Sequence, residues 1–483
     1  MICMHGGLLI RYANNCSTPQ TRVASFVESE SRLTWTSLFL QSYPQANIYL
    51  VGGTVRDILL GHLPKDIDLV IQGVPADKIE RWLTAQGAVR FVGERFGTFK
   101  FVPHGCRNQE PMDIALPRTE SVGPVHGSGR KDLMIQSDYQ ISILEDLSRR
   151  DFTINAIAFD LGSQELHDPF DGLSDLEAQT IRAVGSPEER FYEDATRILR
   201  GLRFACQLRF GIEGETWEAI SNNLDLLNNK TISEDGTYTF VIPRDAIGKE
   251  FLLGFVAHPV HTLTLWDASG ALKQFIPWLN ALKSIVTENG ITAFDQTKKL
   301  LHTLERPSFL SHHQINQIHP NVLIAGLSAF AEDHDHALHL CRQFYLHQFP
   351  HNHPARVDCD VVAWLLENMH VLEEHDPAGM RPSAFEKLFC SQKGKQLLCL
   401  IHGIELVSSK HAASTQRLHT ALQLYGHYCA NTYPRLISGS DIINLGIIPG
   451  VQFRDLLDKI RDAQLVHKIQ TKQDAHQYLK NLI

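Results

Sequence analysis

A pair of aspartates, Asp66 and Asp68, follows the glycine pair Gly52 and Gly53 early in the chain. Glycines between a strand and a helix let backbone N–H groups approach an anion, and the helix N-terminus adds positive potential there. The aspartates are predicted at the start of a strand, where side chains two positions apart share one side and can bind hard divalent cations. Asp113, in a nearby apolar strand-like segment, is the candidate third carboxylate. A phosphate seat beside one or two cations is what phosphoryl or nucleotidyl transfer requires.

A pair of aspartates in this spacing, taken alone, is more typical of a solvated turn or a helix cap. The combination of glycine pair, helix and aspartate pair favours the catalytic interpretation. Other phosphate-binding loops are absent from the sequence, which has neither GxxxxGK[ST] nor a strand-linked GxGxxG. P-loop ATPases and dinucleotide-dependent dehydrogenases are therefore excluded.

A second polar cluster comprises Arg149, Arg150, Asp151 and Asn155, beside an apolar segment that starts at Ile154. Charged groups near a core are costly unless each has a charged or polar partner. A nucleotide supplies such partners, because arginine can form paired hydrogen bonds with phosphate, and Asp151 and Asn155 can bind ribose hydroxyls. The alternative is a loop stabilised by its own salt bridges.

A third cluster lies on a helix predicted over residues 193–207, where Asp194, Arg197 and Arg200 share one side. Asp194 and Arg197 are expected to form an acid–base pair there. Asp194 could accept from the exocyclic amine of cytosine or adenine, and Arg197 could donate to the adjacent ring acceptor. Guanine and uracil place a carbonyl against the carboxylate and would be rejected. The alternative is an ordinary surface ion pair, worth a few tenths of a kcal/mol.

The elements around the first two clusters follow an α/β pattern from about residue 44 to residue 170. Strands are predicted at 48–51, 67–71, 98–102 and 112–116, helices at 55–60 and 75–86, a strand or short helix at 154–160 and a loop at 122–129. Beyond residue 173 we expect no further strands. Helical periodicity marks the segments 193–207, 243–255, 332–349, 361–372 and 416–428.

Length and composition limit the class of protein that this sequence can encode. The chain has 483 residues, of which 43% are hydrophobic and 20% charged, so we expect a globular protein of about three domains. A formal net charge of −9 argues against non-specific coating of nucleic acid. The nine cysteines are scattered without CxxC spacing, which indicates neither a disulfide framework nor a zinc ribbon. No apolar run is long enough to span a membrane, and we expect a cytoplasmic location.

The clusters together resemble the class II tRNA nucleotidyltransferases, the CCA-adding enzymes, and their relatives the bacterial poly(A) polymerases. The segments that carry this resemblance, in family order, are 52–68, 149–156, 168–175, 181–204 and the tail 434–457. The resemblance implies an α+β protein with a nucleotidyltransferase head and an all-helical neck, body and tail. The boundaries expected are 1–43 for an N-terminal extension, 44–170 for the head, 171–260 for the neck, 261–375 for the body and 376–483 for the tail.

The resemblance also implies the reaction, in which the 3′-hydroxyl of tRNA attacks the α-phosphate of CTP or ATP by two-metal phosphoryl transfer. Asp66 and Asp68 would hold two Mg²⁺ ions, and Gly52, Gly53 and Arg56 would lie at the triphosphate. The expected product is a tRNA bearing a complete CCA end.

For the base and ribose, the resemblance carries over further positions. Arg150 and Asp151 would meet phosphate and the ribose 2′-hydroxyl, and Asp194 with Arg197 would pair with the incoming base. Two more arginines are expected at phosphate or in the neck: Arg200 and Arg203.

A segment from Arg118 to about Ser142 is similar to the flexible loop of members that add A or complete CCA. The alternatives left open are a poly(A) polymerase, an A-adding or CC-adding tRNA enzyme, and a catalytically silent RNA-binding protein. The sequence does not indicate the oligomeric state.

Overall fold

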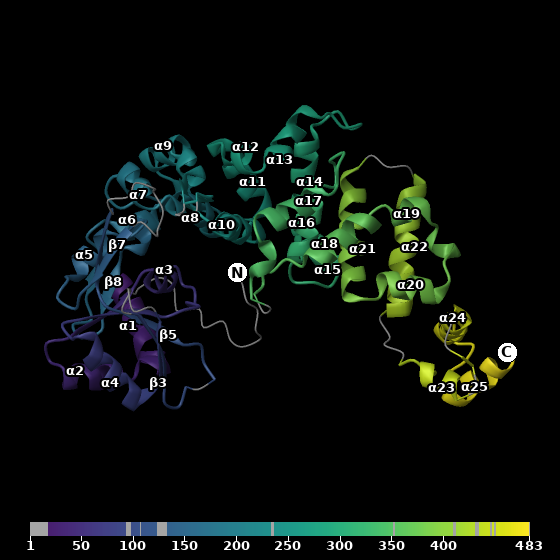
Figure 1. Cartoon of the computed structure of the whole chain (residues 1–483), viewed down its shortest axis with the longest axis horizontal. Coiled ribbons are helices and arrows are strands. Elements are labelled where there is room, and N and C mark those ends of the chain that lie inside the picture. Colours follow the sequence, from purple (N-terminus) through teal and green to yellow (C-terminus); the bar gives the residue numbers. More distant parts are fainter. Residues whose placement is uncertain are drawn as a thin grey trace. The chain divides into compact units, whose positions relative to one another are not determined.

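The computed structural model describes residues 18–482 apart from short segments at 93–97, 107, 123–132, 233–235, 351–352, 409–411, 430–433, 445–446 and 449–450. The chain forms two compact units, and the boundary falls between Ala271 and Leu272. Unit 1 holds a β-sheet with helices, and unit 2 is built of helices, as Figure 1 shows. The predicted α+β class, with a mixed sheet first and a mostly helical remainder, is confirmed.

A seven-stranded sheet, as far as the described residues go, forms the centre of unit 1, with the order β3-β4-β5-β2-β1-β8-β9. The strands are β1 (Asn47–Val51), β2 (Asp68–Gln72), β3 (Gly87–Val92), β4 (Thr98–Pro103), β5 (Met112–Ala115), β8 (Ala158–Asp160) and β9 (Leu166–His167). Strands β2 and β5 run parallel, and the other neighbouring pairs are antiparallel. The four strands predicted at 48–51, 67–71, 98–102 and 112–116 correspond to β1, β2, β4 and β5.

The two faces of this sheet separate the core from the polar clusters. Alternate residues of β1 and β2, including Ile48, Leu50 and Leu69, enter the larger apolar cluster of the unit. The intervening residues, including Tyr49 and Val70, join a smaller cluster on the opposite face. Helix α5 (Ile143–Ser148) packs on this smaller cluster, and we call that side the α5 face.

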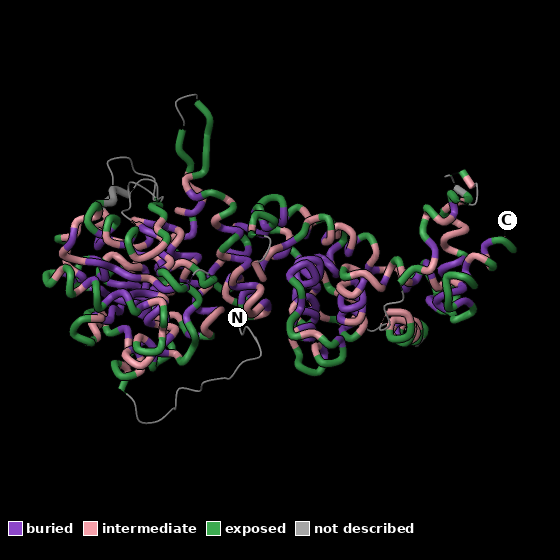
Figure 2. Tube along the Cα trace, turned by 90° about the horizontal axis from the view of Figure 1, so that it is seen from below, coloured by how far each residue is buried: buried purple, intermediate pink, exposed green. Residues whose placement is uncertain are grey.

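Helices lie within the range 1–43 that the sequence predicts as an extension. Helices α1 (Pro19–Ser29) and α2 (Thr36–Ser42) contribute buried residues to the larger apolar cluster, with Trp35 ring-packed on Phe39 and Phe101. Val23, Phe26 and Phe39 of these helices are buried. Buried residues gather in the interior of the structure, as the purple stretches of the tube in Figure 2 show. Residues 18–42 are thus structural parts of unit 1, and residues 1–17 lie outside the described residues.

The remaining helices of unit 1 follow the sheet or flank it. They are α3 (Gly53–Leu59), α4 (Ala76–Gln86), α6 (Gly172–Glu177), α7 (Pro187–Glu193), α8 (Thr196–Leu208), α9 (Gly214–Asn222), α10 (Arg244–Ala257) and α11 (Pro259–Ser269). The expectation that strands end at residue 173 is wrong in detail. Short strands β10 (Thr180–Ile181) and β11 (Gly211–Ile212) pair, as do β12 (Lys230–Ile232) and β13 (Tyr238–Phe240). Strands this short have too little alternation for periodicity to reveal them.

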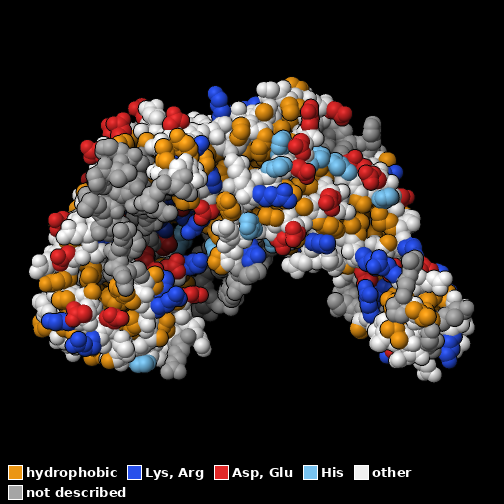
Figure 3. All heavy atoms as spheres, viewed as in Figure 1, with side chains coloured by type: hydrophobic (Ala, Val, Ile, Leu, Met, Phe, Trp, Pro, Cys, Tyr) orange, Lys and Arg blue, Asp and Glu red, His pale blue; other side chains and the backbone are white. Residues whose placement is uncertain are grey.

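Unit 2 consists of helices in its described residues. They include α13 (Pro277–Ala281), α14 (Ala293–Glu305), α15 (Pro307–His312), α16 (Pro320–Leu327), α17 (His336–Gln343), α18 (Cys359–Asn368), α19 (Val371–Glu374), α20 (Pro382–Phe389), α21 (Gln392–Val407), α22 (Ala412–Cys429), α23 (Gly439–Ile443), α24 (Val451–Leu465) and α25 (Lys472–Lys480). Helices α23 to α25 share a small apolar cluster that includes Ile442, Ile460 and Leu479. Histidine side chains gather on the face of unit 2 seen in Figure 3.

Charged side chains join α20 to α24. Arg381 pairs with Asp455 at 3.2 Å and with Asp462 at 2.8 Å, and Arg461 pairs with Glu386. The predicted tail, which begins at residue 376, therefore has internal ion pairs as well as an apolar cluster. Part of the family-like tail segment, at 445–446 and 449–450, lies outside the described residues.

A disulfide joins Cys390 to Cys429, with 5.1 Å between the two Cα atoms. The scattered cysteines gave no reason to expect it, because these two are separated by 39 residues and only the packing of α20 against α22 brings them together. Among the described residues, no helix combines the length and the hydropathy needed to cross a membrane.

Candidate active site

The glycine pair provides a close approach between α3 and the segment after α5. Gly52 has φ +64°, a conformation that favours glycine, and a Cβ atom there would lie 2.7 Å from Arg150 Nη1. The first turn of α3 is hydrogen-bonded to the backbone of the aspartate pair. Thr54 Oγ1 donates to the Asp66 carbonyl and accepts from the Asp68 N–H at 2.9 Å. The spacing from glycine pair to aspartates is thus a structural link, and Thr54, which the sequence reasoning did not single out, makes it.

The predicted acidic residues meet at the start of β2. Asp66 is exposed in the bend before the strand, and Asp68 is its first residue. Asp113 lies directly opposite Asp68 in the parallel β2–β5 pair. Asp68 is on the α5 face because Val70, two residues later, belongs to the cluster on that face. Asp113 is on the same face because its neighbours Met112 and Ile114 belong to the larger cluster on the other face. An Asp113 oxygen accepts from Lys100 at 2.6 Å. The structure therefore places Asp113 next to Asp68, and the Asp113 side chain forms an ion pair with Lys100.

The electrostatic environment of Asp68 is unfavourable to its charge. Burial, together with the charges of Asp113 and Asp66, raises the pKa of Asp68 to about 6, although Arg150 and Lys100 oppose the shift. No described residue donates a hydrogen bond to the side-chain oxygens of Asp66 or Asp68. An acid that is partly buried without a donor is the arrangement expected where a cation binds.

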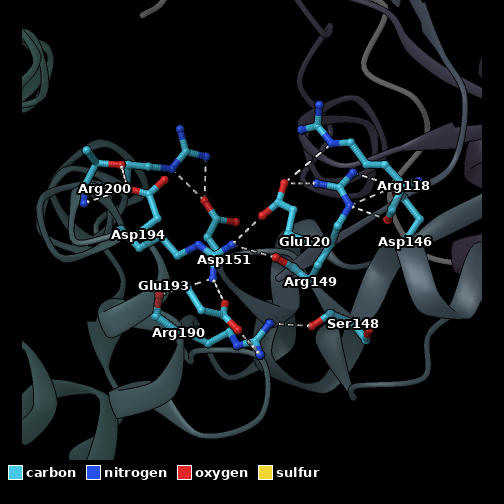
Figure 4. Close-up of polar contacts among 12 residues, drawn as sticks. Arg118, Glu120, Asp146, Ser148, Arg149, Asp151, Arg190, Glu193, Asp194 and Arg200 are labelled. Carbon is cyan, nitrogen blue, oxygen red and sulfur yellow. Dashed lines mark hydrogen bonds and ion pairs between the residues drawn. The ribbon is translucent and has the colours of Figure 1, made fainter. Parts of the chain in front are cut away.

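The neighbouring acid Asp146, in contrast, is saturated with partners. Its side chain is fully buried, and its two oxygens pair with Arg149 at 2.5 Å and Arg150 at 2.8 Å. Burial alone would raise the pKa of Asp146, but the two guanidinium groups hold it at about 2. Asp146 fixes both arginines of the second predicted cluster, as Figure 4 shows for Arg149.

The other members of the second cluster bind side chains from distant segments. Asp151 is buried and its Oδ1 accepts from Asn155 at 3.0 Å, while its Oδ2 accepts from Arg200 of α8 at 2.8 Å. Burial would raise the pKa of Asp151, but Arg200 and Asn155 hold it well below its usual value. Asn155 Oδ1 in turn accepts from Arg56 of α3 at 2.8 Å. The loop thus connects α3 to α8.

Three of the four arginines that are predicted at phosphate lie around one aromatic ring, and Arg150 is the exception among these four. The guanidinium carbons of Arg56, Arg200 and Arg203 lie 5.1, 5.4 and 4.3 Å from the centre of the Phe204 ring. Burial lowers the pKa of Arg203, and the charges of Arg200 and Arg56 lower it further, against the effect of Glu250 at 2.6 Å. Each of these arginines also pairs with a carboxylate, so part of the positive charge around the ring is already compensated; the partners are Asp57, Asp151 and Glu250.

The third predicted cluster differs from the expected helix. Asp194 is not helical: it follows α7 with extended backbone (φ −144°, ψ 98°), and its Oδ1 accepts from the Thr196 N–H and hydroxyl at the start of α8. The expected ion pair of Asp194 with Arg197 is wrong, because Arg197 pairs with Glu193 at 2.8 Å. No described residue donates to the other oxygen of Asp194, so that oxygen can accept from a ligand.

Arg197 is also held by a residue that the sequence reasoning did not single out. Its Nη2 donates to Glu120 at 3.1 Å and to the Arg149 carbonyl at 2.8 Å, and Arg197 is 5% exposed. Glu120 binds Arg149 at 2.7 Å as well, as drawn in Figure 4. Glu120 belongs to β6 (Arg118–Val122), which pairs with β7 (Leu133–Ser137) in the segment predicted as a flexible loop. Residues 123–132 of that segment lie outside the described residues.

A continuous set of contacts now joins all three clusters. Arg150 lies against Gly52 and acts on Asp68, Asp146 joins Arg150 to Arg149, and Arg149 shares Glu120 with Arg197. The acidic pair, the turn at Gly52 and the residues at the start of α8 therefore belong to one connected polar network in unit 1. Asp146 and Glu120 were missed because nothing in the sequence distinguishes them from surface acids. What distinguishes them is their contacts with arginines, which only the structure shows.

Comparison with protein families finds a match over the sheet and the first two polar clusters, and this match ends before α8. Residues 48–182 match the family model of the poly A polymerase head domain. A CCA-adding enzyme of Lactobacillus helveticus is 39% identical over 184 residues, which are 38% of this chain and 43% of that protein. A CCA-adding enzyme of Enterococcus faecalis is 40% identical over 184 residues, or 38% of this chain and 42% of that protein. The matched segment thus spans less than half the length of these relatives.

Solved structures share the fold over nearly the whole chain. The Thermotoga maritima CCA-adding enzyme complexed with tRNA has a TM-score of 0.60 at 19% identity, covering 95% of this chain and 98% of that one. The Bacillus stearothermophilus CCA-adding enzyme in complex with CTP has a TM-score of 0.57 at 20% identity, covering 96% and 98%. Unit 2, which lies outside the family match, is therefore included in the shared fold.

The raised pKa of Asp68 predicts a stabilising substitution. In metal-free protein near neutral pH, Asp68→Asn removes a charge that burial and two acids disfavour, and should raise the free energy of unfolding by about 1–2 kcal/mol. Because the folded pKa lies above the unfolded value of 3.8, the folded wild type takes up a proton as the pH falls through about 6. The advantage of the variant should therefore disappear near pH 4.

Denaturant unfolding in the presence of a chelator measures this difference at each pH. Glu80→Gln, at an exposed position of α4, is the matched control and should change little. Destabilisation by Asp68→Asn near neutral pH would contradict the electrostatic description.

Proposed function

We propose that this chain is a template-independent nucleotidyltransferase that adds CCA to tRNA 3′ ends from CTP and ATP. The observation that carries the proposal is the pair Asp66 and Asp68, to whose side chains no described residue donates a hydrogen bond. This pair lies in one polar network with the arginines around Phe204 and with Asp194. The family match of the head and the CCA-adding names of the relatives support it. Such a reaction fits a cytoplasmic enzyme.

Mg²⁺ fits the donor set at the acidic end of the site. Carboxylate oxygens are the ligands it prefers, and Asp66 and Asp68 would hold two ions, with Asp113 as a further ligand if Lys100 releases it. When bound, the ions would neutralise charge on the attacking and leaving oxygens.

The chain's own residues hold the triphosphate. Arg150 is fixed by Asp146 above Gly52, where only a glycine lets the guanidinium approach the backbone of α3. The guanidinium groups of Arg56 and Arg203, which lie beside the Phe204 ring, add positive charge. Paired hydrogen bonds from guanidinium groups would orient the phosphates toward the acids and restrict their motion.

Residues at the start of α8 select the base. The unoccupied oxygen of Asp194 would accept from the amine of cytosine or adenine and repel the carbonyl of guanine or uracil. The Nη groups of Arg197 already donate to Glu193, Glu120 and two carbonyls, so a base would accept from the Nε–H or displace one of these acceptors. Asp151, held by Arg200, would accept from the ribose 2′-hydroxyl.

Unit 2 would bind the body of the tRNA in this proposal, since the shared fold includes that unit. A poly(A) polymerase and an A-adding or CC-adding tRNA enzyme use the same chemistry and differ in the length and composition of the product. A catalytically silent RNA-binding protein would bind tRNA without releasing pyrophosphate.

Extension of a tRNA lacking its 3′ triplet tests the activity. With Mg²⁺, CTP and ATP, the wild type should add three nucleotides, whereas one, two or a long tail would identify the alternatives. Asp66→Ala should lower the rate about a thousand-fold, because several kcal/mol of charge stabilisation is lost, and should leave tRNA binding intact. Glu80→Gln should match the wild type. Absence of any extension by wild-type protein would refute the proposal.

Asp194→Ala tests base selection separately. Incorporation of single nucleotides from CTP, ATP, UTP and GTP should show the preference for C and A over U and G reduced by at least about 100-fold. Glu188→Ala, at an exposed position on α7 nearby, should retain the preference. Full discrimination by Asp194→Ala would show that another group reads the base.

A further inference from the structure

Three imidazole rings from two separate segments of unit 2 converge. His312 ends α15, His313 follows it, and His402 lies on α21, 89 residues beyond His313. One nitrogen of each ring lies within 4.8 Å of the other two, and His313 Nε2 is 2.9 Å from His402 Nδ1. This is the one group of three His, Cys, Asp or Glu ligand atoms gathered so closely among the residues that the structure describes.

The burial of the rings is graded from inside to outside. His313 is 8% exposed, His402 is half-buried and His312 is exposed. Phe309 packs against His313 and His402, with ring centres 4.6 and 5.2 Å apart, and forms an apolar wall on that side. The group is therefore closed at its inner end and open to water at His312.

The contact between His313 and His402 needs one hydrogen between the two facing ring nitrogens. Two ring nitrogens at 2.9 Å can face each other only when one carries the hydrogen and the other accepts it. A metal ion between neutral rings replaces that hydrogen and engages both lone pairs, with His312 available as a third donor. Three imidazole nitrogens with one open position form a known type of zinc site.

We propose that His312, His313 and His402 bind one late first-row divalent cation, Zn²⁺ by preference, with the fourth position left to water or an added anion. Neutral nitrogen ligands favour this class of ion over Mg²⁺, which prefers oxygen. Bound there, the ion cross-links α15 to α21. The site uses none of the residues assigned to nucleotidyl transfer.

The surroundings set the expected strength of binding. Lys395 of α21 lies close enough to His313 for its positive charge to be felt, and it opposes the cation. The three ligands are neutral and leave the charge of the ion uncompensated. We therefore expect reversible binding that a strong chelator removes.

Zn²⁺ titration of the chelator-treated full-length protein, with cysteines kept reduced, tests the site. The wild type should bind one equivalent that shifts the thermal unfolding midpoint upward, and Co²⁺ should give the visible absorption of a nitrogen-coordinated ion. His312→Gln, at an exposed position, should fold normally and bind Zn²⁺ at least tenfold more weakly. His402→Gln should lose that equivalent, and His302→Gln, exposed on α14, should keep it.

The same titration separates this site from the acidic pair. An Asp66→Asn protein should retain the Zn²⁺ equivalent and the Co²⁺ spectrum whether or not the protein extends tRNA. Equal Zn²⁺ binding by wild type, His312→Gln and His402→Gln would overturn the proposal, as would loss of the equivalent in Asp66→Asn alone.

Discussion

The buried carboxylate of Asp146, paired with both Arg149 and Arg150, is the interaction on which the rest of the site depends. Removing one partner from a buried charge cluster costs about 3–5 kcal/mol, so the two arginines are held firmly in place. Arg150 is thereby fixed against Gly52 on the side of the acidic pair, and Arg149 is fixed against Glu120. A single acid on a short helix of the sheet's α5 face thus positions one arginine at Gly52 and another at Glu120.

The sheet explains why these groups can be polar while the domain remains stable. Alternate residues such as Leu50 and Leu69 fill the larger apolar cluster, together with helices α1 and α2. The α5 face carries fewer apolar residues and accepts charged neighbours. Most acids near this face have arginine partners, whereas Asp66 and Asp68 lack donors among the described residues. The stability of the fold therefore does not depend on the two acids that we propose as cation ligands.

Local patterns were sufficient to predict the strands around the acidic pair, the glycine turn and the polar clusters, because these depend on neighbours in sequence. Contacts between residues far apart in the sequence were not predictable in this way. Glu120 meets Arg197 across 77 positions, and Arg56 meets Asn155 across 99. Asp194 was placed on a helix because its spacing from Arg197 fits one, but it precedes α8 and binds the first turn instead. The roles of the site residues remain predictions.

The central claim is that one nucleoside triphosphate touches both the acidic pair and the start of α8. The most direct measurement is a crystal structure of the full-length protein with Mg²⁺ and a non-hydrolysable CTP analogue. We expect the triphosphate beside Asp66, Asp68 and Arg150, and the cytosine amine at the side chain of Asp194. A nucleotide whose phosphates occupy that seat while its base lies away from Asp194, or one bound elsewhere in the molecule, would contradict the account.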